Sequence, residues 1–236
     1  MSTSGRPFTR DVARYDAWYQ TPWGAYAEAE ELRLLLEMAR PVAGERALDV
    51  GCGTGRMLAR MLALGLDAHG TEPAPDMRAA ARWRLERLGH APELVVDASA
   101  ERLPFEAGAF DLVTAITVLE FVDELPAALR EMARVCRGRI FIGALNARSI
   151  YGAGILRGEA GETLSRARLH TPEELAALVR EHARVRPRRI DVRTTLIGGY
   201  TDDPLQLAVQ SELDLKLRSA RCGLGGFIGL VAEVQT

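Results

Sequence analysis

The segment Leu48-Asp49-Val50-Gly51-Cys52-Gly53-Thr54-Gly55 joins a short apolar run to three glycines at alternate positions. The apolar run predicts a buried strand over 47–50, and the amphipathic residues 56–64 that follow predict a helix. Glycines at such a strand-to-helix turn let the backbone pass close to a ligand at the carboxyl edge of a doubly wound sheet. The spacing is G-x-G-x-G, whereas the dinucleotide fingerprint G-x-G-x-x-G would place its last glycine at Arg56. The turn therefore predicts a ligand site without identifying the ligand.

The same alternation of short apolar runs and amphipathic segments continues after this turn. It predicts further strands over 67–71, 94–96, 110–115 and 139–144, and helices over 76–88 and 123–135. Strands that alternate with helices of this length form βαβ units. The predicted fold is therefore α/β and doubly wound, with a mostly parallel sheet and helices on both faces.

Residues beyond 144 follow a different pattern. Residues 148–168 are predicted to form a loop with one short helix, and Thr171-Pro172-Glu173-Glu174 is a capping box that starts a helix reaching about Glu181. We expect a strand over 189–197, a helix over 204–218 with an apolar residue at every fourth position, and a closing strand over 225–234. Two late strands joined across a helix predict an antiparallel pair at the edge of the sheet.

The composition is that of an ordinary globular protein of 236 residues, 47% hydrophobic and with a formal net charge of −2. The length fits a single domain over 1–236. A charge near zero gives no general attraction to nucleic acid or anionic lipid. The three cysteines and four histidines are dispersed, so we expect neither a disulfide framework nor a metal site. No run approaches 18 apolar residues and the first residues lack a signal-peptide core, so we expect a cytoplasmic protein without a membrane span.

Acidic residues follow the two predicted strands next to the glycine turn. Glu72 ends one of them, 21 residues after Gly51, where a carboxylate can accept both hydroxyls of a ribose. Asp97 follows the other strand beside Ala98, and an acid next to a free backbone N–H matches the donor and acceptor groups of an adenine edge. The glycine turn, Glu72 and Asp97 thus follow three successive predicted strands, and together they predict a ligand that contains a nucleoside.

Several longer segments resemble the class I S-adenosylmethionine-dependent methyltransferases of the ubiquinone/menaquinone-methyltransferase-like (type 11) group. The matching segments are ALDVGCGTG (47–55), GTEPAPDM (70–77), VVDASAERLPFEAGAFDLVTAITVLEFVDE (95–124), REMARVCRGRIFIGALN (130–146), HTPEELAALV (170–179) and GLGGFIGLVAEV (223–234). The resemblance covers about 10–234. It implies a Rossmann-like sheet of seven strands with an antiparallel edge strand near the C-terminus.

The resemblance also implies S-adenosylmethionine as cofactor and S-adenosylhomocysteine as its product. Gly51, Cys52 and Gly53 would line the methionine part of the cofactor, and Glu72 would hold the ribose. Adenine would contact the side chains of Pro73 and Met77 and the edge formed by Asp97 and Ala98. The cofactor-binding residues implied in this way are Tyr15, Gly51, Cys52, Gly53, Glu72, Pro73, Met77, Asp97, Ala98 and Thr117.

Aromatic residues are concentrated near the N-terminus, at Tyr15, Trp18, Tyr19, Trp23 and Tyr26. We interpret 1–40 as a helical lid whose rings face the sulfonium, because aromatic faces attract cations. Packing of these rings onto the core is the alternative. The cofactor-binding half would then cover 41–146 and the substrate-side half 147–236, with insertions at 147–169 and 197–222 that form the acceptor pocket.

The catalytic candidates are Glu120, His170 and Tyr19. Many relatives carry a histidine within 118–122, where this chain has Glu120, which we interpret as a solvated loop acid, with a general base as the alternative. His170 precedes a helix and would either pack or touch substrate. Because a sulfonium is already a strong electrophile, the main task of the protein would be to hold both reactants in line and to exclude water.

The function that these features predict is methyl transfer to a small-molecule acceptor by in-line displacement. One alternative is an RNA or protein methyltransferase that uses a run of arginines between Arg180 and Arg193, and another is a non-catalytic cofactor-binding protein. A short-chain dehydrogenase is excluded, because its Tyr-x-x-x-Lys pair would need a tyrosine where Glu212 precedes the single lysine, Lys216. We expect no nucleic-acid or membrane partner, and the chain could form a homodimer.

Overall fold

The computed structural model describes residues 12–158, 164, 166–183, 185–217 and 223–235, except the side chains of 186–189. The strands are β1 (Arg46–Val50), β2 (Asp67–Thr71), β3 (Val95–Val96), β4 (Phe110–Ile116), β5 (Cys136–Leu145), β6 (Val185–Thr195) and β7 (Phe227–Val234). The helices are α1 (Val12–Trp18), α2 (Pro22–Ala39), α3 (Arg56–Ala63), α4 (Pro75–Arg87), α5 (Leu125–Val135), α6 (Ile150–Leu156), α8 (Pro172–His182) and α9 (Pro204–Leu217). Two 3-10 turns, η1 (Pro92–Leu94) and η2 (Leu119–Phe121), complete the described elements.

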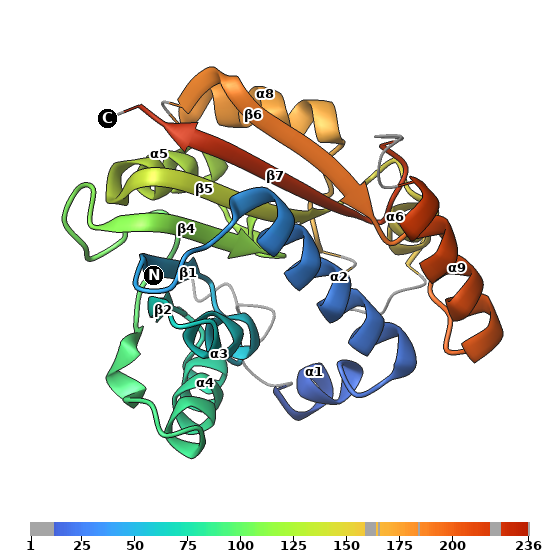
Figure 1. Ribbon diagram of the computed structural model, residues 1–236, viewed down its shortest axis with the longest axis horizontal. Coiled ribbons are helices and arrows are strands. Elements are labelled where there is room, and N and C mark those ends of the chain that lie inside the picture. The colour runs from blue at the N-terminus through green and yellow to red at the C-terminus, as the bar shows by residue number, and fades with distance from the viewer. Residues whose placement is uncertain (1–11, 159–163, 165, 184, 218–222, 236) are drawn as a thin grey trace.

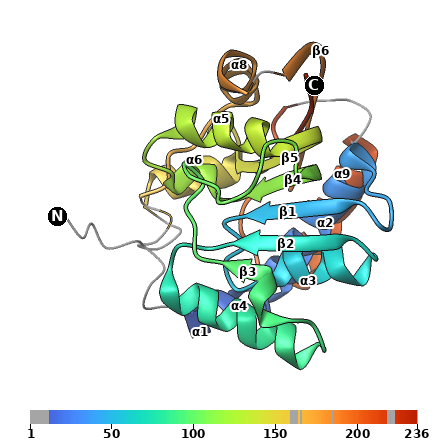
Figure 2. The same cartoon turned by 90° about the vertical axis from the view of Figure 1, so that its left-hand side faces the viewer.

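The strands form one sheet in the order β3-β2-β1-β4-β5-β7-β6. Strands β1 to β5 are parallel to their neighbours, whereas β7 lies antiparallel between β5 and β6 (Figure 1). Figure 2 shows the parallel strands in this spatial order. The predicted fold class, with its antiparallel strands at the sheet edge, is thereby confirmed. In this arrangement the order in which successive strands are added to the sheet reverses between β1 and β4, and doubly wound folds bind ligands at such a switch point.

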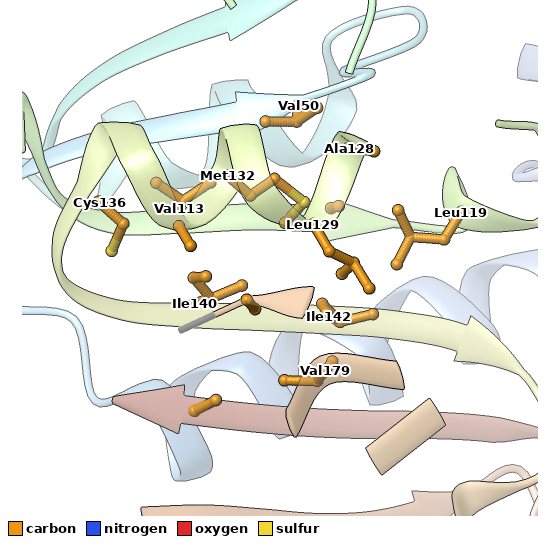
Figure 3. Packing of buried hydrophobic residues seen from close by; sticks show 14 of the residues in the cluster. Val50, Val113, Leu119, Ala128, Leu129, Met132, Cys136, Ile140, Ile142 and Val179 are labelled. Carbon is orange, nitrogen blue, oxygen red and sulfur yellow. The ribbon is translucent and has the colours of Figure 1, made fainter. Parts of the chain in front are cut away.

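Each face of the sheet has its own apolar core. Helices α5 and α8 cover one face, where Leu129, Met132 and Val179 pack on Val113 and Ile140 (Figure 3). Helices α2, α3 and α4 cover the other face. Strands buried on both faces explain why the sequence shows continuous apolar runs instead of alternation.

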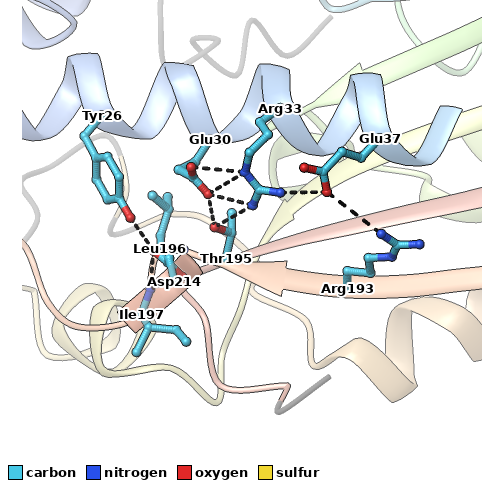
Figure 4. Close-up of polar contacts among 9 residues, drawn as sticks. All are labelled: Tyr26, Glu30, Arg33, Glu37, Arg193, Thr195, Leu196, Ile197 and Asp214. Atoms are coloured by element: carbon cyan, nitrogen blue, oxygen red, sulfur yellow. Dashed lines mark hydrogen bonds and ion pairs between the residues drawn. The ribbon is translucent and has the colours of Figure 1, made fainter. Parts of the chain in front are cut away.

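Helix α2 is fixed to the distant β6 and α9 by buried polar contacts (Figure 4). Glu30 accepts hydrogen bonds from the Arg33 guanidinium and from the Thr195 hydroxyl. Tyr26 donates to Asp214 of α9, whose carboxylate also accepts from the backbone N–H of Leu196 at 3.1 Å. Buried carboxylates need such hydrogen-bond partners, and here the partners connect α2 to β6 and α9.

The largest differences from the predicted boundaries are at the starts of two strands, and helix α9 exposes its apolar stripe. Strands β5 and β6 begin three and four residues earlier than predicted, at Cys136 and Val185. The apolar stripe of α9 faces outward, with Leu205 78% and Val209 59% exposed. The side of α9 that faces the protein carries Asp214, which receives the backbone donors described above.

In the part of the chain that the structure describes, no helix combines the length and the apolar character needed to cross a bilayer. Within the same residues, no group of three or more His, Cys, Asp or Glu side chains is arranged to hold a metal ion.

Candidate active site

The glycine turn follows β1 at the carboxyl edge of the sheet and passes close to two other segments. Gly51 and Gly53 have φ values of 68° and 56°, a conformation that side chains with a Cβ adopt only with strain. A Cβ on Gly51 would lie 2.7 Å from both Cγ atoms of Val118, and one on Gly53 would lie 3.7 Å from the Tyr15 hydroxyl oxygen. The turn therefore needs glycine for its conformation at both positions and, at Gly51, also for space.

A cavity of about 1160 Å³ extends from this turn. Its volume exceeds the ~300–1000 Å³ of a typical single-ligand pocket, so it has room for two reactants. The predicted residues that line it are Tyr15, Tyr19, Gly51, Gly53, Glu72, Pro73, Met77 and Thr117. These residues come from the N-terminal segment and from the ends of β1, β2 and β4, so the fold brings most of the predicted cofactor site together.

Glu72 links the second strand to the glycine turn. One carboxylate oxygen accepts from the Gly53 N–H at 2.9 Å, and the other accepts from the Ala74 N–H at 2.8 Å. Each carboxylate oxygen can accept a second hydrogen bond, so this side chain can orient the turn and also receive a pair of ligand hydroxyls. Its position in the cavity wall fits the ribose role expected from the sequence.

Three predicted cofactor residues lie outside the wall of this cavity. The Asp97 side chain is 64% exposed and pairs with Arg78 at 3.1 Å, and neither it nor Ala98 lines the cavity. Ser99, Ala100 and Glu101 of the same segment line it instead. Cys52 lines a smaller neighbouring cavity of about 40 Å³, and burial raises the pKa of its thiol well above the ordinary value.

The N-terminal aromatic residues differ in position: one packs in the core and others line the cavity. Trp23 is fully buried in the core and also reaches the cavity. Tyr15 and Trp18 line the cavity from a short helix, α1, which has no buried residue, and Tyr19 lines it from the turn that follows α1. The Tyr15 and Tyr19 hydroxyl oxygens are 3.1 Å apart, so the two phenols lie side by side. Tyr15, Trp18 and Tyr19 therefore form part of the cavity wall, as the lid hypothesis requires, and the lid itself stays a prediction.

Polar contacts hold α1 against the glycine turn and α4. Asp16 of α1 accepts from the Thr54 hydroxyl at 2.8 Å and from the Arg84 guanidinium at 2.7 Å. The guanidinium of Arg56 lies 4.4 Å from the centre of the Tyr19 ring. Because Thr54 belongs to the glycine turn, α1 and the turn form one unit. The sequence analysis did not identify Asp16.

The catalytic candidates occupy different surroundings. Glu120 is only 1% exposed, so its interpretation as a solvated acid is wrong. The turn η2 places its carboxylate under the end of β5, where one oxygen accepts from the Leu145 N–H at 2.6 Å, and burial raises its pKa to about 7. His170 lies outside both cavity walls, and burial lowers its pKa. Tyr19 lines both cavities, and burial raises the pKa of its phenol well above the ordinary value.

Glu31 is a cavity residue that the sequence analysis missed. It lies on α2 and lines both cavities, and burial together with the charges of Glu28 and Glu120 raises its pKa to about 8. A signal was present in the sequence, because Ala27, Glu31 and Leu35 lie four residues apart, which puts an acid within an apolar helical stripe.

The far end of the cavity is aromatic, and two of its residues, Tyr151 and Tyr200, were not predicted from the sequence. Trp23 lies with its ring centre 5.7 Å from that of Tyr151 on α6 and 6.1 Å from that of Tyr200. Arg14 and Arg157 are the basic side chains in the described cavity wall, whereas Glu31, Glu72 and three further acids line it. The site as a whole therefore favours cations over anions.

Residues 48–141 match the family model described as a methyltransferase domain. The ubiquinone biosynthesis O-methyltransferase of Thiobacillus denitrificans is 27% identical over 197 residues, which cover 79% of this chain and 82% of that protein. The Xanthomonas oryzae protein of the same name is 35% identical over 111 residues, which cover 44% of this chain and 45% of that protein, so the chain spans less than half of its length.

Among solved structures, a methyltransferase of Thermotoga maritima, described as S-adenosylmethionine-dependent and as a possible histamine N-methyltransferase, superposes with a TM-score of 0.69. The superposition covers 97% of this chain and 98% of that chain at 23% identity. It establishes that the two chains share a fold.

Proposed function

We propose that this chain, which belongs to the class I S-adenosylmethionine-dependent methyltransferases, transfers the methyl group to a small-molecule acceptor held in the aromatic end of its large cavity. The observation that carries the proposal is the extent of that cavity. It begins at Gly51, Gly53 and Glu72 and continues to Trp23 and Tyr151, so donor and acceptor can meet within one cavity. Holding two reactants in line is the main catalytic need of a displacement reaction.

The residues present fit the cofactor. The Gly51 and Gly53 backbone would border its methionine part, the Glu72 carboxylate would receive the ribose hydroxyls, and Pro73 and Met77 would pack on the adenine. Tyr15 lies close enough to the turn to cover it. When bound, S-adenosylmethionine supplies an electrophilic methyl group. We retain Asp97, Ala98, Cys52 and Thr117 as proposed cofactor residues; the ion pair of Asp97 with Arg78 would have to open for adenine to reach it.

The size and composition of the cavity support a small acceptor. The relatives named above include one described as an O-methyltransferase of ubiquinone biosynthesis and one described as a possible histamine N-methyltransferase, both of which act on small molecules by those descriptions. Of the arginine run considered for RNA, Arg193 pairs with Asp191 and Glu37, and the side chains of Arg184, Arg186, Arg188 and Arg189 lie outside the described residues. An RNA or protein methyltransferase and a non-catalytic binder remain the alternatives to be tested.

Two measurements on the full chain test the proposal. Calorimetry should give tighter binding of S-adenosylmethionine and S-adenosylhomocysteine than of NAD. Incubation of a metabolite extract with methyl-labelled cofactor, followed by mass spectrometry, should yield a labelled product below 1 kDa. Label found only in added RNA or protein would support the macromolecular alternative, and cofactor binding without any labelled product would support the non-catalytic one.

The variant Glu72→Ala tests the cofactor site within the same experiment. Loss of a charged hydrogen-bond acceptor should weaken cofactor binding by ~1.5–3 kcal/mol. Because Glu72 also receives the Gly53 and Ala74 N–H groups, we expect some loss of folding stability as well. Glu72→Gln is the control, since it keeps one acceptor oxygen. An unchanged dissociation constant in Glu72→Ala would show that the carboxylate does not hold the ribose.

A further inference from the structure

Glu31 is a buried acid that the cofactor site does not explain. Its side chain lies in the wall of both cavities, and the residue is 7% exposed. Among the described residues, its carboxylate has no hydrogen bond or ion pair, in contrast to Glu28, Glu30 and Glu72. A buried carboxylate without a partner is costly, so this position is suited to gaining a proton or a cation from a ligand.

The location of Glu31 is where donor and acceptor would meet. Trp23, Ala27 and Glu31 follow one another along the cavity wall at intervals of four residues on α2. At 1.5 Å per residue, Glu31 is about 12 Å along the helix from Trp23 at the aromatic end. Gly51 and Thr117, at the cofactor end, line both cavities together with Glu31. The carboxylate is therefore beside the cofactor end, with the aromatic chamber extending away from it.

The groups that face Glu31 explain why its pKa is raised. Burial is the largest effect on its pKa, followed by the like charges of Glu28 and Glu120, while Arg56 acts in the opposite direction. Arg56 is already paired with Glu28 at 2.7 Å, which limits what it can offer Glu31. Groups from each surrounding element act on or respond to this carboxyl: Glu28, Arg56, Glu120, Tyr15, Tyr19 and Tyr151.

We propose that Glu31 is the proton acceptor of the reaction and that its substrate is an amine with an apolar or aromatic body. The proposal rests on the proposed function and specifies its acceptor. The amine would lie against Glu31, and its body would extend toward Trp23, Tyr151 and Tyr200. A cationic amine supplies the positive charge that would pair with the Glu31 carboxylate. The surrounding aromatic faces also attract the cation.

The other groups of the site are less suited to this role. Glu72 is occupied by two backbone donors, and Glu120 lies outside both cavity walls. Tyr15 has a pKa raised to about 12 by burial, so its phenol is a poor proton acceptor at neutral pH. An acceptor that carries a carboxylate at its reacting end would be repelled by the ionised Glu31, which argues against an anionic acceptor.

The step balances without a further reactant. The ionised Glu31 carboxylate removes one proton from the ammonium group, which leaves a neutral amine with a free electron pair. That pair forms the bond to the methyl carbon while the bond between this carbon and sulfur breaks, and its electrons remain on sulfur. The products are the N-methylated ammonium ion, the thioether S-adenosylhomocysteine and protonated Glu31, which returns its proton to solvent.

The first test measures binding, independently of turnover. With S-adenosylhomocysteine present, 2-phenylethylamine and tryptamine should bind the wild-type protein at least tenfold more tightly than the neutral 2-phenylethanol. At pH 7, calorimetry in two buffers of different ionisation enthalpy should show a proton released as the amine binds, because Glu31 must ionise. Glu31→Gln should lose both the preference and the proton release. A wild-type protein without the ammonium preference would overturn the proposal.

The second test measures catalysis with the same variant. Removing a general base should lower kcat/KM by about 10²–10⁴-fold. Glu37→Gln is the matched control, since it makes the same change on α2 in a side chain that pairs with Arg33 outside the cavity wall. Its kcat/KM should stay within twofold of the wild-type value. Products from the labelled extract should carry the new methyl group on nitrogen.

The outcomes separate this proposal from the proposed function. A protein that binds no S-adenosylmethionine and labels no small molecule would refute the proposed function itself. A wild-type protein that labels only oxygen or carbon, or a Glu31→Gln variant with undiminished turnover, would refute the role of Glu31 and leave the methyltransferase assignment intact. Loss of cofactor binding in Glu31→Gln, with the ammonium preference retained, would assign Glu31 to the cofactor and also overturn the proposal.

Discussion

The two ends of the large cavity, the one proposed for the cofactor (the cofactor end) and the one proposed for the acceptor (the acceptor end), are built in different ways. At the cofactor end, a single turn of adjacent residues supplies backbone groups, and Glu72 holds that turn through the Gly53 N–H. At the acceptor end, the wall is made of side chains from residues far apart in the sequence, such as Trp23, Tyr151 and Tyr200. A site made of local backbone is visible in a short motif, whereas one made of distant side chains depends on the whole fold.

The largest effect should come from breaking the backbone turn. Gly51→Val places a β-branched residue at a φ of 68° and puts its Cβ 2.7 Å from Val118. We expect a loss of more than ~3 kcal/mol in the free energy of unfolding, since strain and overpacking combine. Cofactor binding should be lost as well. Urea unfolding and calorimetry measure the two effects.

Gly89→Val is the control for this prediction. Gly89 has a similar φ of 81°, but a Cβ there would meet nothing within 4 Å. It should cost only the conformational strain, ~1–2 kcal/mol, and leave cofactor affinity unchanged. Equal losses in the two variants would show that the approach of Val118 to the turn has no energetic importance.

The next effect concerns the acid between the two ends. The pKa of Glu31 is raised from an ordinary value of 4.5 to about 8 in the folded protein. Between these values the folded protein binds a proton that the unfolded chain has released, so stability falls as the pH rises from about 5 to about 8. Glu31→Gln removes this contribution and should be more stable than the wild type at pH 8 by ~1–3 kcal/mol, each pH unit corresponding to ~1.4 kcal/mol at most.

Urea unfolding at pH 5, 6.5 and 8 measures this difference. Asp49 and Glu120, whose pKa values burial raises to about 7, contribute slopes of the same sign and remain in the variant. The variant should therefore keep a weaker slope than the wild type, and Glu37→Gln should keep the wild-type slope. Parallel curves for wild type and Glu31→Gln would mean that Glu31 is not perturbed by folding.

The sequence predicts the residues of the cofactor end better than those of the acceptor end. The strand-turn-helix pattern, Glu72 and the parallel sheet could be predicted, because hydrophobic periodicity and glycine spacing are local signals. Tyr151 was missed because its place in the cavity wall depends on the whole fold. Glu31 was missed although it lies within an apolar helical stripe, because that spacing does not show that the stripe faces a cavity. The interpretation of Glu120 failed for a related reason, because its carboxylate is buried beside the end of β5, where it accepts from the N–H of Leu145, 25 residues away along the chain.

A smaller effect should come from loosening the contacts of α1 with the cofactor end. Asp16→Ala removes the acceptor of the Thr54 and Arg84 hydrogen bonds. Because these groups are partly exposed, we expect cofactor affinity to fall by only ~1 kcal/mol, and the melting temperature to change little, since α1 has no buried residue. Calorimetry and thermal unfolding of the one variant test both. Lost stability with intact affinity would show that α1 serves packing and not closure.

The smallest effect should come from the outer surface of α9, beyond the acceptor end. Val209 is 59% exposed in a stripe with Leu205 and Leu213, so Val209→Lys should change the free energy of unfolding by less than ~0.5 kcal/mol. Asp214→Ala, on the inner face of the same helix, is the contrast. It leaves the backbone N–H groups of Leu196 and Ile197 without their acceptor and should cost ~1–3 kcal/mol.

Gel filtration of Val209→Lys beside the wild-type protein shows what the stripe does. If the stripe faces water, both proteins elute at the same mass and unfold at the same urea concentration. If a second copy of the chain covers it, the lysine buries a charge in an apolar contact, so the apparent mass should fall and stability should become dependent on protein concentration. A matched mass together with unchanged stability would exclude this surface from a homodimer interface. It would also restrict the function of α9 to its inner face, where Asp214 holds Tyr26 of α2 beside the acceptor end.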